Sequence, residues 1–207
     1  LYDLTAVRPK GFVERHRVFE VRERVTVDGE IYEPLNEDDV RKACNAFLTE
    51  EVETIAVCFL HSYANSQHEE RAAEIIRSKL PNIHISTSST ILPEYREFER
   101  FSTTALNAYV APKTSKYLKN LEQDLLSFGL KTPIKIMGSN GGTWSVGQIA
   151  ERPANALLSG PAGGVIAATK LAAALNIEDI ITYDMGGTST DACMIRNGSF
   201  NMNPEGM

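Results

Sequence analysis

The stretch that decides the fold is residues 179–198, which read Asp-Ile-Ile-Thr-Tyr-Asp-Met-Gly-Gly-Thr-Ser-Thr-Asp-Ala-Cys-Met-Ile-Arg-Asn-Gly. Two runs rich in strand-forming residues, 179–183 and 192–196, flank a polar segment with a Gly-Gly pair at its centre. The Asn197-Gly198 pair that follows is typical of a type I′ turn. The stretch therefore predicts a strand, a tight polar turn, a second strand and a second turn.

The polar segment has the composition of a phosphate-binding turn. Gly186 and Gly187 free the backbone to approach an anion, and successive N–H groups can then form a concave nest. Hydroxyl donors follow at Thr188, Ser189 and Thr190. Asp184 and Asp191 bracket the turn and would repel phosphate, so we expect a cation between them, most simply Mg²⁺. The alternative is an ordinary Gly-Gly hairpin with a polar loop.

Upstream of this segment, hydrophobic periodicity predicts alternating helices and strands, which is α/β layering. The pattern first predicts a hairpin in 17–33 around Asp28-Gly29 and a helix capped by Asn36. A strand over 54–60 should follow, buried on both faces as in a parallel sheet. A helix from a capping box at Ser66–Glu69 to about Leu80 and a weaker strand over 83–87 come next.

Two helices are then expected, over 94–109 and from Pro112 to Gly129, with the domain boundary at Ala111-Pro112. Beyond them the pattern predicts a strand over 133–137, a short helix capped by Ser145, and a helix of small residues to about Leu175 that Ser159 caps. Arg96 and Arg100, four residues apart beside two glutamates, indicate a charged helix face.

Three further segments are candidates for binding or catalysis. Ser139-Asn-Gly-Gly142 (Ser139, Asn140, Gly141, Gly142) follows a strand, where main-chain amides suit a substrate site; a plain polar turn is the alternative. Ser159-Gly160-Pro161 opens a helix whose N-terminus can attract anions, or it forms a hinge without ligand contact. His61 ends a strand and could act as an acid, a base or a metal ligand, or be structural.

Composition limits the function classes. The chain has 207 residues, enough for one large or two small domains, with 21 Lys and Arg against 27 Asp and Glu. An acidic balance of this kind argues against a nucleic-acid partner. No apolar run is long enough to span a membrane, no signal peptide is recognisable, and three scattered cysteines indicate a reducing cytoplasm.

Taken together, these motifs resemble the hydantoinase/5-oxoprolinase family, A-type subunit, within the superfamily of actin-like ATPases, sugar kinases and heat-shock chaperones. The turn 184–191 resembles the superfamily's second phosphate loop, and 159–168 its connecting helix. The narrower family resemblance is carried by Leu60-His-Ser-Tyr63, His68-Glu69, Leu92–Arg100, Ser102-Thr-Thr104, Asn107-Ala-Tyr109, Ser139–Gly142, Ser159-Gly-Pro161 and Asp184–Asp191.

The resemblance implies an α/β fold made of parts of two ribonuclease-H-like domains, with mixed sheets flanked by helices. Residues 1–111 would be the C-terminal part of the first domain and 112–207 the start of the second. It implies ATP and Mg²⁺, with phosphate at Gly186–Thr190 and at Ser159 and Gly160, and metal at Asp184 and Asp191. The implied activity is opening of a cyclic amide, a hydantoin or 5-oxoproline, with a B-type hydantoinase subunit or domain as partner.

Two other functions share the same ATP site: a ketone carboxylase resembling acetone carboxylase, and an ATP-driven switch or activator, which usually carries cysteine ligands for an iron–sulfur cluster. The family's longer chains carry a first Asp-x-Gly-Gly-Thr-x-Thr-Asp loop, and this sequence has one such motif. We therefore expect an internal fragment that does not turn over ATP by itself.

Overall fold

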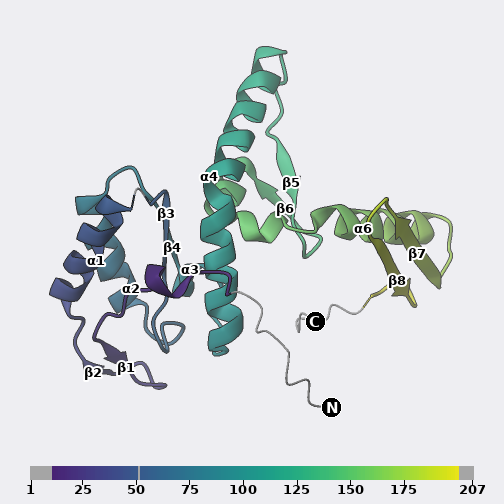
Figure 1. Ribbon diagram of the computed structural model, residues 1–207. Helices are drawn as coiled ribbons and strands as arrows, with labels where there is room; N and C mark the ends of the chain where they lie inside the picture. The colour runs from purple at the N-terminus through teal and green to yellow at the C-terminus, as the bar shows by residue number, and fades with distance from the viewer. Residues whose placement is uncertain (1–10, 51, 201–207) are drawn as a thin grey trace, which may run out of the picture. The chain divides into compact units, whose positions relative to one another are not determined.

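The computed structural model of the chain describes residues 11–50 and 52–200. Contacts divide the chain after Lys113 into two compact units, and this boundary falls within the long helix α4 (Glu97–Ser127). Each unit has its own small sheets and its own helices, so the chain is a mixed α/β protein (Figure 1). The elements before α4 are η1 (Arg15–Arg17), β1 (Arg24–Val25), β2 (Ile31–Glu33), α1 (Glu37–Thr49), β3 (Thr54–Val57), α2 (Gln67–Lys79), β4 (His84–Thr87) and α3 (Ser88–Ile91).

The first unit is organised around a parallel pair of strands joined by a helix. β3 and β4 pair in parallel from Thr54 opposite His84 to Val57 opposite Thr87, and α2 makes the crossover between them. Apolar residues of α1, α2 and both strands form one core, with Val40, Cys44, Ile55, Val57, Ala72, Ile75, Ile76 and Leu80 buried. The predicted parallel arrangement and the predicted hairpin, β1 with β2, are both confirmed.

The strand prediction for 54–60 is correct in position but wrong in two details. β3 ends at Val57, and the following residues turn away into a loop. Ile55 and Val57 are buried while Ala56 is exposed, so a single face of β3 packs, against α1 and α2. The continuous apolar run in the sequence reflects packing of the loop residues Cys58, Phe59 and Leu60, which are half-buried, rather than a strand covered on both sides.

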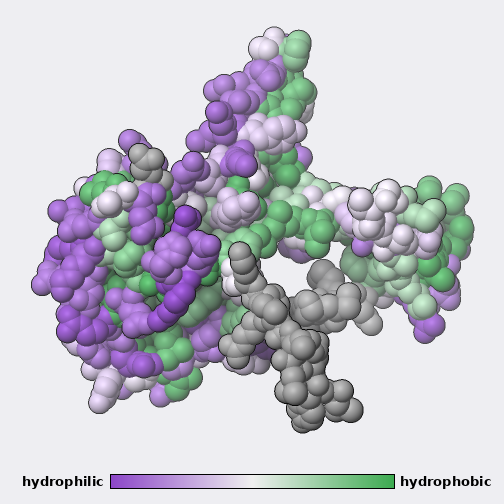
Figure 2. Space-filling model, viewed as in Figure 1, coloured by the Kyte–Doolittle hydropathy of each residue, from purple (hydrophilic) through white to green (hydrophobic). Residues whose placement is uncertain are grey.

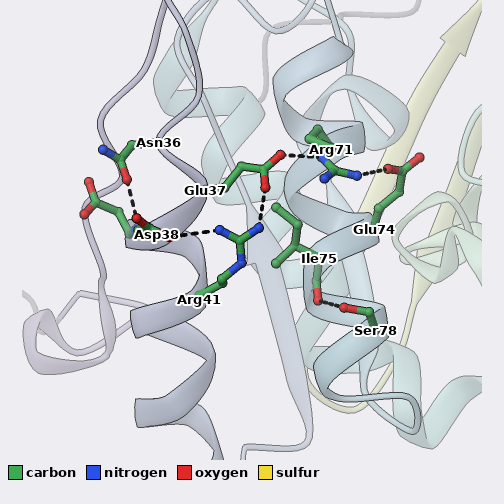
Figure 3. A network of polar contacts seen from close by, with 9 residues as sticks. Asn36, Glu37, Asp38, Arg41, Arg71, Glu74, Ile75 and Ser78 are labelled. Carbon is green, nitrogen blue, oxygen red and sulfur yellow. Dashed lines mark hydrogen bonds and ion pairs between the residues drawn. The ribbon is translucent and has the colours of Figure 1, made fainter.

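An ion pair between Arg71 and Glu37 joins the exposed sides of α2 and α1, and pairs within each helix surround it (Figure 3). The Arg71 guanidinium of α2 donates to Glu37 of α1 at 2.7 Å and to Glu74 of its own helix at 3.0 Å. Arg41 pairs with Glu37 and with Asp38. Exposed pairs of this kind contribute little stability, because solvent screens their charges. The apolar core between the helices is therefore what holds them together.

The prediction of two helices separated at Ala111-Pro112 is wrong, because α4 continues from Glu97 to Ser127 with Pro112 inside it. A proline removes one main-chain donor and usually breaks a helix. Here Ala108, Ala111 and Leu118 are buried on either side of it, and this packing anchors the turns before and after the proline. The predicted C-terminal end at Gly129 is confirmed, since Gly129 has φ +91° and Leu130 donates back to the Leu125 carbonyl.

The second unit holds β5 (Lys135–Met137), β6 (Thr143–Ser145), α5 (Val146–Glu151), η2 (Pro153–Ala156), α6 (Ser159–Ala174), β7 (Ile180–Met185) and β8 (Thr190–Ile195). Its small core consists of Leu118, Val146 and Ile149, and the partly buried residues Ile134, Ile136, Trp144 and Ala156 pack against it. The predicted cap at Ser145 is confirmed: the Ser145 side chain accepts from the Gln148 N–H, and the structure adds a capping box in which the Gln148 side chain accepts from the Ser145 N–H. The sequence missed β6, a three-residue strand that follows a Gly-Gly turn and ends at the cap residue Ser145.

An ion pair ties the chain before β1 to the first turn of α1. The Arg22 guanidinium donates to both oxygens of Asp39, at 2.7 and 3.0 Å. Asn36, as predicted, caps α1 by accepting from the Asp39 N–H at 3.0 Å. Hydrogen bonding to Arg22 lowers the pKa of Asp39 from 3.8 to about 2.

The stability of the first unit should therefore depend on pH in the acid range. A carboxyl whose pKa is lowered by folding contributes stability above its unfolded pKa, and this contribution is lost as the pH falls toward the folded value. We expect Arg22→Ala to be less stable than wild type at about pH 6, with the difference shrinking as the pH falls from about 5 to about 2. Urea unfolding at each pH measures the difference in the free energy of unfolding between the variant and wild type. The control is Arg24→Ala, which removes an exposed positive charge nearby. A difference that stays constant over that range would contradict the assignment.

Candidate functional site

The predicted polar turn connects β7 and β8, an antiparallel hairpin. Asp184 lies opposite Asp191 and Met185 opposite Thr190, and the hairpin closes with a bond of 2.9 Å from the Gly186 N–H to the Ser189 carbonyl. All residues from Asp184 to Asp191 are exposed. The predicted sequence of strand, turn and strand is confirmed, as is the turn at Asn197-Gly198, where both residues have positive φ.

The two aspartates of the hairpin lie on one face of it, because directly opposite residues of an antiparallel pair share a face. Like charges in such a position repel, so the arrangement favours a bound cation. Within residues 11–50 and 52–200 no group of three His, Cys, Asp or Glu side chains could hold a metal. One or two carboxylates are nevertheless what Mg²⁺ takes from a protein when it keeps its waters and binds phosphate, so the residues fit that ion.

The two faces of the hairpin differ. Ile195, on the same face as Asp184 and Asp191, is fully buried, and this face packs on α6. The opposite face exposes Ile181, Tyr183, Met185 and Met194, and Figure 2 shows apolar residues on the surface over β7 and β8. Asp184 and Asp191 therefore lie on the face of the hairpin that α6 covers, at the end of that face next to the turn.

The predicted substrate loop reaches the same face. A hollow of about 140 Å³ is lined by Ser139, Asn140 and Gly141, by Ala162, Val165 and Ile166 of α6, and by Cys193 of β8. The structure therefore brings three of the predicted substrate residues together with the strand that also carries Asp191. Gly141 has φ +77°, and a Cβ there would come within 2.9 Å of Ile166, so a glycine is needed for the loop to touch α6.

The side chains of this loop are engaged within the unit. The Ser139 hydroxyl donates to the Asn155 carbonyl at 2.9 Å, and Asn140 Oδ1 accepts from the Gly142 N–H at 3.0 Å. The Asn140 bond lies within the turn, whereas the Ser139 bond ties the turn to η2, 16 residues further along the chain. A ligand in the hollow would therefore meet main-chain groups and apolar side chains first.

The start of α6 differs from the prediction that Ser159 caps it. Ser159 is the first helical residue, and the cap position is held by Leu158 in the left-handed conformation, φ +61°, with no side-chain cap bond. Gly160 has open space where a Cβ would stand. The first turn is thus built of small residues with uncapped main-chain N–H groups, which suits an anion.

His61 belongs to the first unit. It follows β3, has φ +58°, and its Nδ1 lies 2.9 Å from the Val25 carbonyl. Since a carbonyl only accepts, we assign the proton to Nδ1, which leaves the lone pair on Nε2. The ring also packs edge-on to Tyr63. His61 is half-buried and is held in one orientation from the β1 side.

The sequence failed to predict a buried polar cluster at the carboxyl ends of β3 and β4. Glu69, interpreted as part of a capping box, instead points inward and is fully buried, while Ser66 makes no side-chain cap bond. Arg100, interpreted as part of a charged helix face, is also fully buried. The cluster further includes Ser62, Ser86, Ser88, Thr104 and Asn107. The sequence carried one signal of this burial, a set of residues at helical spacing on one face of α4. On that face the polar residues Arg100, Thr104 and Asn107 precede the apolar residues Ala108 and Ala111, and all five are buried.

Solved structures identify the class of fold. The crystal structure of ATP-dependent caprolactamase from Pseudomonas jessenii is 33% identical and superposes with a TM-score of 0.84 over 94% of this chain and 28% of its own. A nucleotide-free structure of acetone carboxylase is 32% identical, with a TM-score of 0.77 over 86% of this chain and 25% of its own. Both have an actin-like ATPase fold, so this chain is a part of that fold.

The family follows from the sequence. The family model described as hydantoinase/oxoprolinase matches residues 100–207, and that of the hydantoinase/oxoprolinase N-terminal region matches residues 1–80. The chain belongs to the hydantoinase/oxoprolinase family.

Two relatives match almost the whole chain. Uncharacterized protein MJ0964 of Methanocaldococcus jannaschii is 41% identical over 96% of this chain, and caprolactamase subunit alpha of Pseudomonas jessenii is 32% identical over 99%. The chain spans 29% of the length of each of these relatives.

The contact between the Ser139–Gly142 loop and α6 can be tested at Gly141. We expect Gly141→Ala to lower the free energy of unfolding by about 1–3 kcal/mol, because the new Cβ combines an unfavourable positive φ with a clash against Ile166. Gly164→Ala, in α6 with open space around it, is the matched control and should gain up to about 1 kcal/mol in helix propensity. Urea denaturation measures both. Equal stability of Gly141→Ala and wild type would show that the loop does not need this geometry.

Proposed function

We propose that the full-length protein is an ATP-dependent amidohydrolase that opens a cyclic amide, a hydantoin, 5-oxoproline or a related lactam. The observation that carries the proposal is the pair Asp184 and Asp191, opposite each other on a hairpin whose turn contains two glycines and three hydroxyl residues. Family membership and the similarity to a caprolactamase support the substrate class. The two units would be parts of two ribonuclease-H-like domains, 1–111 and 112–207.

In this proposal the hairpin turn binds the phosphates of ATP. Main-chain N–H groups of Gly186 and Gly187 and the hydroxyls of Thr188, Ser189 and Thr190 would donate to phosphate oxygens. Ser159 and Gly160, at the uncapped start of α6, would add main-chain donors. Asp184 and Asp191 would hold Mg²⁺, which when bound offsets the negative charge on the phosphates.

The proposed chemistry makes a stable amide reactive. Transfer of the γ-phosphoryl group to the amide oxygen breaks its bond to ADP and leaves the ring carbon electrophilic. Water then adds to that carbon and gives up a proton. The ring C–N bond breaks as its nitrogen takes up a proton, which opens the ring and leaves an acyl phosphate, and a second water hydrolyses this to the carboxylate and free phosphate. We assign the substrate to Ser139–Gly142 and the neighbouring hollow, and proton transfer to Nε2 of His61, whose Nδ1 is engaged with Val25.

A B-type subunit or domain is the proposed partner, since similar proteins are named as subunits, alpha in caprolactamase and beta in acetone carboxylase of Xanthobacter autotrophicus. We also propose a cytoplasmic location. The three cysteines, all within the described part of the chain, are free, and none of the described helices is long and apolar enough to cross a membrane.

A ketone carboxylase is the second candidate, because the acetone carboxylase structure is nearly as similar as the caprolactamase structure. The two functions share the ATP site and differ in what is phosphorylated. Purified full-length protein with its partner subunit should consume ATP in response to a lactam for the first function, and in response to a ketone with bicarbonate for the second. An ATP-driven switch would respond to neither, and the scattered cysteines do not favour its iron–sulfur ligands.

We expect Asp184→Ala or Asp191→Ala in the full-length protein to lower the rate of coupled hydrolysis by about 10²–10³-fold, because each removes one electrostatic contributor to phosphoryl transfer. Phosphate release with saturating ATP and substrate measures the rate, and circular dichroism checks the fold. Glu178→Gln, which removes an exposed carboxylate just before β7, is the matched control and should keep wild-type activity. Wild-type rates in either aspartate variant would remove the proposed metal role.

A further inference from the structure

We propose that Glu69 is a positioning residue: its buried carboxylate fixes the main chain of Phe59 and thereby sets the orientation of His61. The inference rests on the proposed function in one respect, the role of His61 in proton transfer. Its structural part, control of the His61 ring by Glu69, stands on contacts within the first unit and can be measured independently of activity.

Glu69 reaches from the first turn of α2 to the carboxyl ends of both parallel strands. Its Oε1 accepts from the Phe59 N–H at 2.8 Å and from the Ser88 hydroxyl at 2.6 Å, and its Oε2 accepts from the Ser89 N–H at 2.8 Å. Phe59 follows β3, and Ser88 and Ser89 follow β4. Residues just beyond the carboxyl ends of parallel strands are where ligands bind in open α/β sheets. Glu69 thus organises the main chain at the place where a site is expected.

Phe59 is held on both sides of its backbone. Glu69 accepts from its N–H, and its carbonyl accepts from Arg100 Nη2 of α4 at 3.3 Å. The Arg100 guanidinium also donates to the Glu94 carbonyl and lies over the Tyr63 ring, 5.3 Å from its centre. The buried side chains of Glu69 and Arg100 therefore fix the start of the loop that carries His61.

The far side of the loop is fixed through the same carboxylate. Ser62 Oγ lies 2.9 Å from Ser88 Oγ, and Ser88 in turn donates to Glu69. His61 therefore stands between two anchored residues, Phe59 and Ser62. A positive φ is unfavourable for histidine and persists where the surroundings impose it. With the loop held this way, the ring can keep its bond to the Val25 carbonyl.

The contacts at Glu69 need a carboxylate and not an amide of the same shape. Both oxygens face main-chain N–H groups, of Phe59 and of Ser89, which can only donate. A glutamine would place its own NH₂ against one of these donors in either orientation. Glu69→Gln therefore releases one strand end while changing the side-chain volume very little.

The experiment compares Glu69→Gln with Glu70→Gln in the full-length protein. Glu70 is the exposed neighbour, which accepts from Ser66 at the surface, so its variant controls for loss of a charge on α2. Histidine is labelled with ¹⁵N, and His61→Gln assigns the His61 signals. We expect Glu69→Gln to shift the His61 ring signals away from the Nδ1–H tautomer, with kcat falling by about 10²-fold and KM nearly unchanged. Glu70→Gln should match wild type in all three.

Several outcomes separate the two proposals. Unchanged His61 signals in a folded Glu69→Gln variant, with or without a lower melting temperature, overturn the positioning role. If His61→Gln keeps wild-type activity, the proposed role of His61 in proton transfer fails, and shifted His61 signals in Glu69→Gln still support control of the ring. Should Glu69→Gln not fold, Ser88→Ala takes its place: it removes the hydroxyl that links Glu69 to Ser62 and leaves both main-chain N–H bonds to Glu69. A smaller shift of the His61 signals in the same direction supports the proposal, and none overturns it.

Discussion

The first unit depends on one buried carboxylate. Strands β3 and β4 end at adjacent places, and their ends leave main-chain N–H groups that must be paired if they are buried. Glu69 accepts from one such N–H group after each strand. A single side chain therefore pairs donors that would otherwise need water or further strand residues as acceptors. Burying a carboxylate is costly unless hydrogen bonds surround it, and here three neutral donors do. Apolar residues of α2 hold the helix over the sheet, and the Glu69 contacts fix the loop that leaves β3 against the first turn of that helix.

Elements whose signals are local were predicted well from the sequence. Asn36 and Ser145 cap helices through bonds that span three residues, and Gly129 and Asn197-Gly198 adopt the positive φ that their turn types require. The parallel pairing of β3 with β4 also followed, because a helix between two apolar strands leaves few other arrangements. For the caps and turns the energetic reason lies within a few residues of the signal, whereas the strand pairing follows from the order of the elements along the chain.

Predictions failed where contacts far apart in the sequence decide the structure. Pro112 is a strong local signal for a helix end, yet packing of Ala108, Ala111 and Leu118 carries α4 through it. Glu69 stands at the position of a capping-box glutamate, yet it turns inward because donors at residues 59, 88 and 89 lie there. Arg100 has the neighbours of a surface residue, yet carbonyls at 59 and 94 and the Tyr63 ring bury it. A charged residue is expected to be exposed unless it is paired, and the sequence does not show which distant residues would pair with it.

The candidate site shows the same division between local and distant causes. The turn 184–191 was predictable because glycine, hydroxyl and carboxylate residues occupy adjacent positions whose geometry a hairpin fixes. The hollow lined by Cys193 of β8 was not predictable, because it forms where the Ser139–Gly142 loop, α6 and β8 meet, and Gly141 and Ile166 are 25 positions apart in the sequence.

The carboxylates of the hairpin and the buried carboxylate of Glu69 also differ in electrostatics. The aspartates of the hairpin are exposed, so their repulsion is weakened by solvent until a cation or phosphate displaces water. Glu69 is buried and fully paired, so its charge is already committed to the main chain. An exposed pair of like charges suits a ligand that comes and goes, whereas a buried, satisfied charge suits a fixed support for a neighbouring group.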